Sequence, residues 1–240
     1  MAGASRPSSE ARRLSYDPLS PEALRHILIP RCLMSRAENL DLVREYTKSD
    51  SLIKHMLAVE AAMRAYARKF GEDEEKWGTV GLLHDFDYER WPNPPDHPLQ
   101  GSRILKERGY SEEIIYAIKS HASYLTDCPR VSRLDKALFA CDELCGFITA
   151  CALVRPNRLE ELEAKSVRKK MKQVTFAAAV KREDITSGAA DLGVDLDEHI
   201  QFCIAALREA AAELGLLPAT VAHSTEDRQD AAGLNSEGMR

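Results

Sequence analysis

Residues 51–70 read SLIKHMLAVEAAMRAYARKF, and this stretch carries the pattern that decides the fold. Its apolar residues recur three or four positions apart, as they do on the buried face of an amphipathic helix: Leu52, Met56, Val59, Met63, Tyr66 and Phe70. Asp50 or Ser51 can cap the start of such a helix, and Gly71 can end it. The stretch therefore predicts one long helix.

The chain on either side of that helix continues with the same period. We predict further helices over about 74–84, 97–108, 111–124, 131–154, 158–173, 183–192 and 196–216. Residues 87–98 are predicted as a loop, because the WPNPP run at 91–95 removes backbone donors and restricts the residues before each proline. No run alternates as a strand would, so the predicted fold class is all-α.

The 240 residues divide into four predicted regions. Residues 1–20 are rich in Ser, Pro and Arg and predict a flexible N-terminal arm, and residues 218–240 predict a flexible C-terminal tail. Residues 21–157 are predicted to form one helical domain. Residues 158–217 are predicted to form a helical extension packed on that domain.

Composition and charge indicate which kinds of partner the protein can have. A formal net charge of −5 gives no basic footprint, so we expect no nucleic-acid polymer as partner. No apolar run reaches the roughly 18 residues of a membrane span, and the N-terminus lacks the apolar core of a signal peptide. We therefore expect a cytoplasmic protein without a membrane partner, and we expect its six cysteines to be free thiols. The oligomeric state cannot be read from the sequence.

His55 and the pair His84-Asp85 are the first candidates for chemistry. His55 lies on the apolar face of the first helix, where taken alone it fits a hydrogen-bonded core histidine better than a ligand. His84 and Asp85 follow the apolar run VGLL. A helix C-terminus favours a histidine but not an aspartate, and a buried carboxylate needs a cation, so this pair favours a metal or a catalytic role.

Three further residues extend the pattern. Asp142 lies in the middle of an apolar helix, where a buried carboxylate pairs either with a core histidine or with a metal. His121 follows Ile118 on one helix face, and His97 opens a helix after the proline-rich loop; each alone has an ordinary structural explanation. The remaining histidines fall in polar surroundings, and we expect His199 to be exposed: His26, His199 and His223.

Together these residues predict a metal site in the core of a helical bundle. Four of the seven histidines and two embedded aspartates fall between residues 55 and 142. Histidine and carboxylate ligands together suit Fe, Mn, Zn or Co better than Mg or Ca alone. Ligands that come from several helices are typical of bundle-core metal sites.

The order of these residues resembles the HD superfamily of metal-dependent phosphohydrolases. That family has a lone histidine, an adjacent His-Asp pair and a distant aspartate, which correspond here to His55, His84-Asp85 and Asp142. His97, in a His-Pro-x-x-Gly setting, and His121 resemble the additional ligands of two-metal members. The resemblance covers about residues 51–156, and the stretch at 82–88 looks most like the bacterial predicted hydrolases of this superfamily whose substrate is unassigned.

The resemblance implies a role for each residue. One or two divalent ions (Fe, Mn, Zn, Co or Mg) would be held by these six ligands: His55, His84, Asp85, His97, His121 and Asp142. Asp85 would bridge the two ions and act in catalysis, with Asp87 or Glu89 moving the proton of a metal-activated water. Lys54 or the basic helix that contains Arg168 and Lys169 would hold the phosphate, although a solvated face explains that helix better.

The function implied is a hydrolase acting on a small phosphorylated metabolite or nucleotide, as a phosphomonoesterase or phosphodiesterase. The chain lacks the Gly-Tyr-Pro signature of cyclic-di-GMP hydrolases, which speaks against that substrate. Two alternatives remain open. One is a di-iron oxygenase resembling myo-inositol oxygenase, and the other is a non-catalytic metal-binding helical module.

Overall fold

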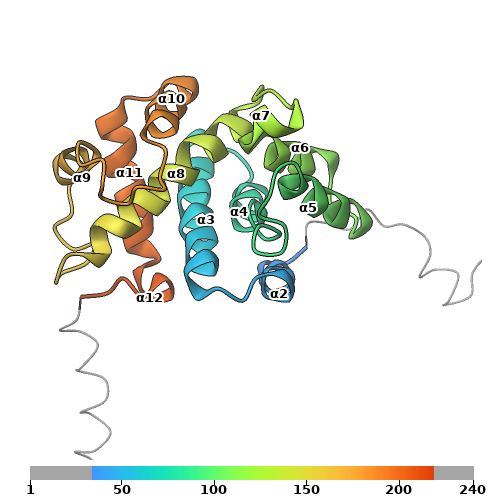
Figure 1. Ribbon diagram of the computed structural model, residues 1–240, viewed down its shortest axis with the longest axis horizontal. Coiled ribbons are helices and arrows are strands. Elements are labelled where there is room, and N and C mark those ends of the chain that lie inside the picture. Colours follow the sequence, from blue (N-terminus) through green and yellow to red (C-terminus); the bar gives the residue numbers. More distant parts are fainter. Residues whose placement is uncertain (1–33, 219–240) are drawn as a thin grey trace, which may run out of the picture. The chain divides into compact units, whose positions relative to one another are not determined.

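The computed structural model describes residues 34–218, and within this range it contains eleven helices and no strand (Figure 1). The all-α class predicted from the sequence is therefore confirmed. In chain order the helices are α2 (Arg36–Tyr46), α3 (Asp50–Phe70), α4 (Glu74–Leu83), α5 (Asp96–Glu107), α6 (Glu112–His121), α7 (Ser123–Thr126), α8 (Arg133–Leu153), α9 (Ala164–Met171), α10 (Arg182–Leu192), α11 (Leu196–Glu209) and α12 (Ala211–Leu214).

Helix α3 has the boundaries and the buried face that its sequence predicts. Its start is capped by the hydroxyl of Ser49, which accepts a hydrogen bond from the Leu52 N–H, rather than by either of the two residues predicted. It ends at Gly71, whose φ of 70° is a left-handed conformation that glycine adopts without strain. Most of the predicted apolar face is fully buried: Met56, Val59, Met63 and Tyr66.

Helix α8 is the second long helix and contacts more of the fold than its neighbours do. It packs against α3, α4, α6, α9, α10 and α11. Ser132 and Asp135 form a capping box at its start, in which each side chain bonds the backbone of the other. Its buried residues surround Asp142, which itself stays partly exposed. This aspartate therefore opens toward a cavity, whereas its neighbours Cys141 and Leu144 lie in the core.

Helices α3 and α8 separate two groups of helices, as Figure 1 shows. On one side α4 packs on α3 and α6 packs on α8, with α5 beside α6. On the other side α10 packs on α8 and α11 packs on α3, with α9 beside α11. All six predicted ligands lie on α3, on α8 or in the part of the chain from α4 to α6, so the second group contributes none of them.

A glycine lets α4 come close to α3. A Cβ atom at Gly81 would lie 2.9 Å from the backbone Cα of Glu60 on α3, a separation that side chains do not tolerate. Because Gly81 lacks that atom, the C-terminal turn of α4 rests directly on α3. This contact brings His84, the residue that ends α4, toward His55.

Several boundaries differ from those predicted. Helix α2 was not singled out by the sequence pattern. Helix α6 ends at His121, because Ala122 leaves helical geometry with φ −107° and ψ 48°. The helix predicted over 158–173 begins only at Ala164, since the preceding turns contain Arg158 and Glu161 at positive φ.

The prediction for His199 was wrong, because this histidine is 1% exposed. Its Nε2 lies 3.0 Å from the carbonyl oxygen of Ala140, and its Nδ1 lies 2.6 Å from the hydroxyl of Tyr66. The Cys203 sulfur lies 3.7 Å from the same Nδ1. We call Tyr66, His199 and Cys203 the tyrosine–histidine cluster; it joins α3, α8 and α11.

The predicted N-terminal arm, and the predicted C-terminal tail apart from Pro218, lie outside the described residues, as do His26 and His223. The division at residue 157 stays a prediction. The five cysteines within the described range are buried free thiols: Cys128, Cys141, Cys145, Cys151 and Cys203. Among helices in that range, none combines the length and the apolar character that crossing a membrane requires.

Candidate metal centre

The structure brings all six predicted ligands together in two adjoining groups. The first group contains His55, His84, Asp85 and Asp142, and the second contains Asp85, His97 and His121. Within each group one ligand atom from every residue lies within 4.8 Å of the others. Asp85 belongs to both groups, so the two sites share one carboxylate.

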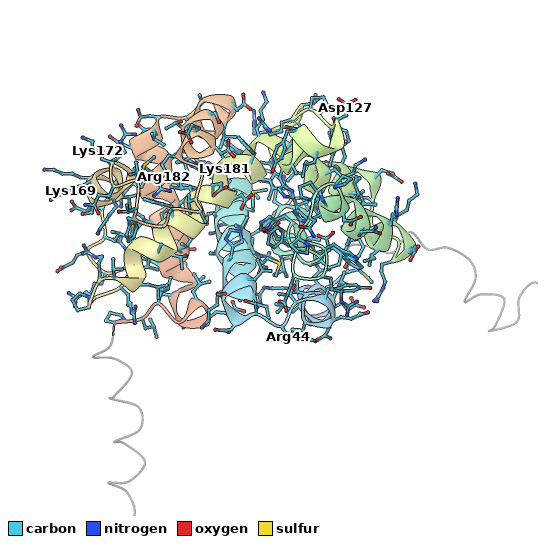
Figure 2. All side chains as sticks on the ribbon, viewed as in Figure 1. Arg44, Asp127, Lys169, Lys172, Lys181 and Arg182 are labelled. Atoms are coloured by element: carbon cyan, nitrogen blue, oxygen red, sulfur yellow. The ribbon has the colours of Figure 1, made fainter. Side chains whose placement is uncertain are left out.

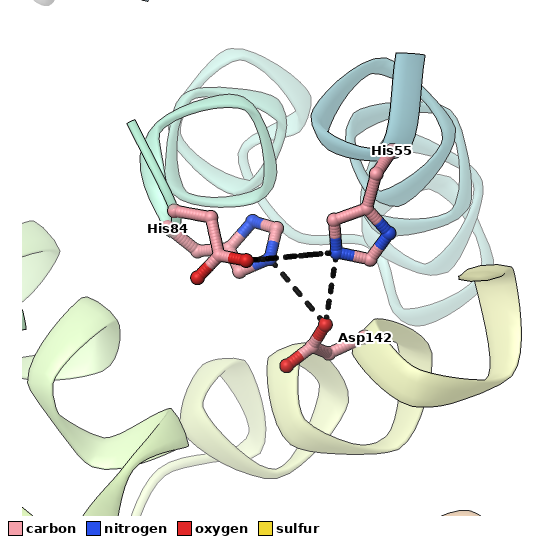
Figure 3. Close-up of side chains that lie close together, drawn as sticks. His55, His84 and Asp142 are labelled. Atoms are coloured by element: carbon pink, nitrogen blue, oxygen red, sulfur yellow. Dashed lines mark hydrogen bonds and ion pairs between the residues drawn. The ribbon is translucent and has the colours of Figure 1, made fainter. Parts of the chain in front are cut away.

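The first group joins three helices at one point, which Figure 3 shows for three of its members. The Nε2 atoms of His55 and His84 are 3.2 Å apart. The Asp142 Oδ1 lies 3.1 Å from the Nε2 of His55 and 3.4 Å from that of His84. Asp85 adds its Oδ2 atom at 3.8 Å and 3.5 Å from the same two nitrogens.

The second group uses the other oxygen of Asp85. The Oδ1 atom lies 3.2 Å from the Nε2 of His97 and 3.6 Å from the Nε2 of His121. The two histidine nitrogens are themselves 3.2 Å apart. Asp85 therefore offers one oxygen to each group.

The tautomers of these histidines test whether a cation fits. The Nδ1 of His84 donates to the carbonyl of Gly81 at 2.8 Å, and the Nδ1 of His121 donates to the carbonyl of Ile118. In the neutral ring, a donor at Nδ1 leaves Nε2 as an acceptor. These acceptor nitrogens face other histidine nitrogens and carboxylate oxygens. Acceptors that converge on acceptors require a proton or a metal ion between them, so the donor set fits divalent metals.

Asp87 holds His97 in the corresponding tautomer. Its Oδ1 accepts a hydrogen bond from the His97 Nδ1 at 2.7 Å, and its Oδ2 accepts one from the Gly101 N–H at 2.7 Å. A Cβ atom at Gly101 would lie 2.8 Å from the Asp87 carboxyl carbon, so this bond needs glycine there. A buried carboxylate behind a histidine is the usual support of a metal-binding imidazole. The proton-transfer role expected of Asp87 does not fit, because the side chain is 1% exposed.

The charges of the site reinforce one another. Burial alone would lower the pKa of His84, but the carboxylates of Asp85 and Asp142 outweigh it and raise that pKa to about 9. The same opposition, with Asp85 and Asp87 as the anions, raises the pKa of His97 to about 9. Although burial opposes it, the nearby histidines hold the pKa of Asp85 and Asp142 below the usual range. Without a metal ion the carboxylates are therefore ionised and paired with imidazolium groups, and a divalent cation would take the place of the imidazolium protons.

A cavity of ≈ 370 Å³ opens in front of the ligands. Its walls include Tyr88 and Tyr124, the carboxylates of Glu143 and Asp184, and the ammonium group of Lys181. Burial, followed by the charge of Asp142, raises the pKa of Glu143 to about 7. The Lys181 Nζ lies 3.5 Å from the hydroxyl of Tyr124. The cavity is large enough for a small phosphorylated molecule.

The segment before α10 forms one wall of this cavity. Ala179, Val180 and Lys181 line it. The guanidinium of Arg182 donates hydrogen bonds to the carbonyls of Phe176, Ala177 and Val180. These bonds fix an otherwise irregular stretch, so the position of Lys181 is set by its neighbour.

Four other predicted site residues lie elsewhere. Glu89 accepts hydrogen bonds from the N–H groups of Lys48 and Ser49 at the start of α3. Lys54 forms an ion pair with Asp50 at 2.7 Å. Neither side chain lines the metal cavity.

The basic helix is also displaced from the site. Arg168 pairs with Asp197 at 3.2 Å, and Lys169 lines a different cavity. Figure 2 shows Lys169 on α9 and Lys172 directly after it, apart from Lys181 beside α8. The cation that the cavity contains is Lys181, which sequence reasoning missed because it follows an irregular stretch without a motif.

Comparison with known proteins finds similarity over part of this chain. The family model of the HD domain matches residues 52–146. Ribonuclease Y of Oleidesulfovibrio alaskensis is 29% identical over 120 residues, and ribonuclease Y of Nitratidesulfovibrio vulgaris (strain DP4) is 31% identical over 118 residues. Each alignment covers 48% of this chain but 20% of the relative. No solved structure matches the chain significantly.

Proposed function

Residues 52–146 match the family model of the HD domain, and from this premise we propose that the protein is a metal-dependent phosphohydrolase that acts on a small phosphorylated substrate. The observation that carries the proposal is the position of Asp85 between two groups of acceptor nitrogens. Each group needs a cation, and one carboxylate serves both. This arrangement is typical of two-metal hydrolytic sites, in which both ions act on one phosphoryl group.

In the proposed site His55, His84, Asp85 and Asp142 would hold the first ion, and Asp85, His97 and His121 would hold the second. When bound, such ions polarise a phosphoryl oxygen and make water nucleophilic near neutral pH. Their identity among Fe, Mn, Zn, Co and Mg is left to measurement, since histidine and carboxylate ligands accept several of them.

The remaining cavity residues take supporting roles in the proposal. Lys181 holds a phosphate oxygen, in the role expected of Lys54, Arg168 and Lys169. Glu143 takes the proton, because it is a cavity carboxylate adjacent to a ligand but without an imidazole partner of its own among the described residues. Asp87 acts only through His97, which it orients.

A small substrate is favoured by the charges around the cavity. Its carboxylates outnumber its ammonium groups, so a long polyanion finds no basic track beside the metal site. The relatives are nevertheless ribonucleases by name, and the chain spans about a fifth of their length. A short single-stranded RNA therefore belongs in the test beside small phosphomonoesters and phosphodiesters.

The test combines metal content with turnover. Protein purified anaerobically without chelator is analysed by elemental mass spectrometry and assayed on p-nitrophenyl phosphate, bis-p-nitrophenyl phosphate and a short RNA. We expect about two ions per chain and hydrolysis of a small ester that is lost in His84→Ala and Asp85→Ala. Asp184→Asn is the matched control, because it lines the same cavity outside both ligand groups.

Each other result has a definite meaning. Hydrolysis that survives in both ligand variants would disprove the proposal. Two irons with oxygen consumption but no hydrolysis would favour the oxygenase alternative instead. Bound metal that raises the melting temperature, with no turnover of any substrate, would favour a non-catalytic module.

A further inference from the structure

The basic helix α9 borders a second cavity, of ≈ 240 Å³, which we call the α9 cavity. Its cationic wall consists of Arg155, Lys169 and Lys170, and its apolar wall contains Cys151, Val154 and Leu162. No aspartate or glutamate lines it. None of its lining residues belongs to the metal cavity, so the two are separate sites.

In another cavity of the same molecule the arginines are paired with carboxylates. The cavity between α3 and α11 is lined by Arg36, Arg64 and Arg68. Arg36 and Arg64 both bind the buried carboxylate of Glu60. Arg68 binds carboxylates at 2.6 Å and 3.0 Å. All three arginines are thus neutralised from within the chain, as a structural cavity requires.

The cations of the α9 cavity lack such neutralisation among residues 34–218. Lys170 lies 3.3 Å from the amide oxygen of Gln173 and packs over the ring of Phe176. Arg155 donates only to backbone carbonyls, those of Glu160 and Glu161, and its buried Nε has no partner. A site with three cations and no carboxylate attracts an anion.

The charges and the apolar surface of the α9 cavity indicate which class of anion it would bind. Three cationic groups match a doubly charged phosphate better than a single carboxylate, because each can donate a charge-assisted hydrogen bond. The side chains of Val154 and Leu162 offer an apolar surface beside them. We propose that the α9 cavity is a second binding site, for a small organic phosphate whose apolar group packs on that wall.

The test uses phenylphosphonate, which carries both groups and has no ester bond to hydrolyse. Its binding is measured by calorimetry on the wild-type protein and on Lys169→Gln and Lys170→Gln. We expect each variant to bind about tenfold more weakly or worse, as loss of a charge-assisted bond implies. Lys165→Gln and Lys172→Gln are matched controls, because both lysines belong to the same basic segment but line no cavity described here.

A thiol gives an independent readout that needs no variant. Cys151 is 2% exposed and lines the α9 cavity, so N-ethylmaleimide should reach its thiol slowly and through that cavity. A bound ligand should slow this alkylation further, and peptide mass spectrometry measures its rate. We expect phenylphosphonate to protect Cys151 more strongly than inorganic phosphate or benzoate, which each carry half of the recognised features. Binding that is equal in all four lysine variants, together with an alkylation rate unchanged by phenylphosphonate, would overturn the proposal. Equal protection by inorganic phosphate would overturn its apolar part.

The outcome of this binding test does not depend on the proposed function. Phenylphosphonate bound at the metal cavity would be insensitive to Lys169→Gln and would leave Cys151 unprotected. Loss of hydrolysis in ligand variants would in turn leave the α9 cavity intact. The two proposals can therefore fail separately.

Discussion

Helices α3 and α8 each contribute to two clusters with buried histidines, and the two clusters satisfy their nitrogens in opposite ways. In the tyrosine–histidine cluster, both nitrogens of His199 face neutral partners, the Tyr66 hydroxyl and the Ala140 carbonyl. In the candidate metal centre, His84 bonds one carbonyl and turns its other nitrogen toward acceptors. Burial alone therefore does not identify a ligand; what matters is whether the inward nitrogen has a donor to meet.

The comparison of the two clusters predicts the largest loss of metal and of activity for a substitution of Asp85. Asp85→Asn removes the charge shared by both groups, so we expect both ions to be lost. Because metals supply several kcal/mol to the transition state, hydrolysis should fall by about 1,000-fold. Elemental analysis and steady-state kinetics measure both effects.

Asp142→Asn is the matched control for that change. It removes a carboxylate from the first group only, so the second group should keep its ion. Equal metal content in the two variants would show that Asp85 does not bridge.

At the other cluster, His199→Ala should affect stability and leave the metal centre alone. The change removes the hydrogen-bond partner of the Tyr66 hydroxyl and leaves a cavity in the core. Together these two effects should lower the free energy of unfolding by about 3 kcal/mol. Urea denaturation measures the loss, and metal content per chain should stay at the wild-type value. A variant that lost its metal would break the distinction between the clusters.

Gly101→Ala should weaken the binding of the second ion only. The added Cβ would collide with the Asp87 carboxylate, which then releases the Nδ1 of His97. Loss of such a supporting bond lowers metal affinity by about 10- to 100-fold. Competition with a chelator measures the affinity of each ion, and the first ion should titrate as in the wild type. Equal weakening of both ions would contradict the role given to Asp87.

Tyr66→Phe should have the smallest effect. It removes one hydroxyl that bonds His199, at a cost of about 1 kcal/mol in the free energy of unfolding. Metal content and turnover should not change. A destabilisation as large as that of His199→Ala would mean that Tyr66, and not the histidine, organises the cluster.

The sequence was sufficient to predict the fold class and to predict that the six candidate ligands lie close together. Helical period places each of these residues on an apolar face or at a helix end, and helices in contact bring such positions together. Their role as ligands remains a prediction. His199 was misjudged because its acidic neighbours at 195–198 suggest a solvated turn, whereas the first turn of α11 points that one side chain inward.

The supporting residues could not be found in the same way. The bond between Asp87 and the Gly101 N–H depends on how the loop folds back onto α5, and no periodicity describes a loop. Lys181 follows a stretch whose course is set by the carbonyl contacts of Arg182. Lys54 and Arg168 were proposed from their charge, but each has an acidic partner close by.

The spacing of the first ligand group along the chain also bears on biosynthesis. His55 and Asp142 are separated by 87 residues, and the intervening positions contain every other predicted ligand. A nascent chain that has emerged only as far as α6 exposes histidines without the carboxylate that completes the first site. Ligands so distant in sequence meet only after α3 has packed on α8, which cannot happen before α8 has been synthesised. In the proposed metalloenzyme the first ion would therefore bind only after α8 has packed, and metal uptake during translation would report when α8 docks.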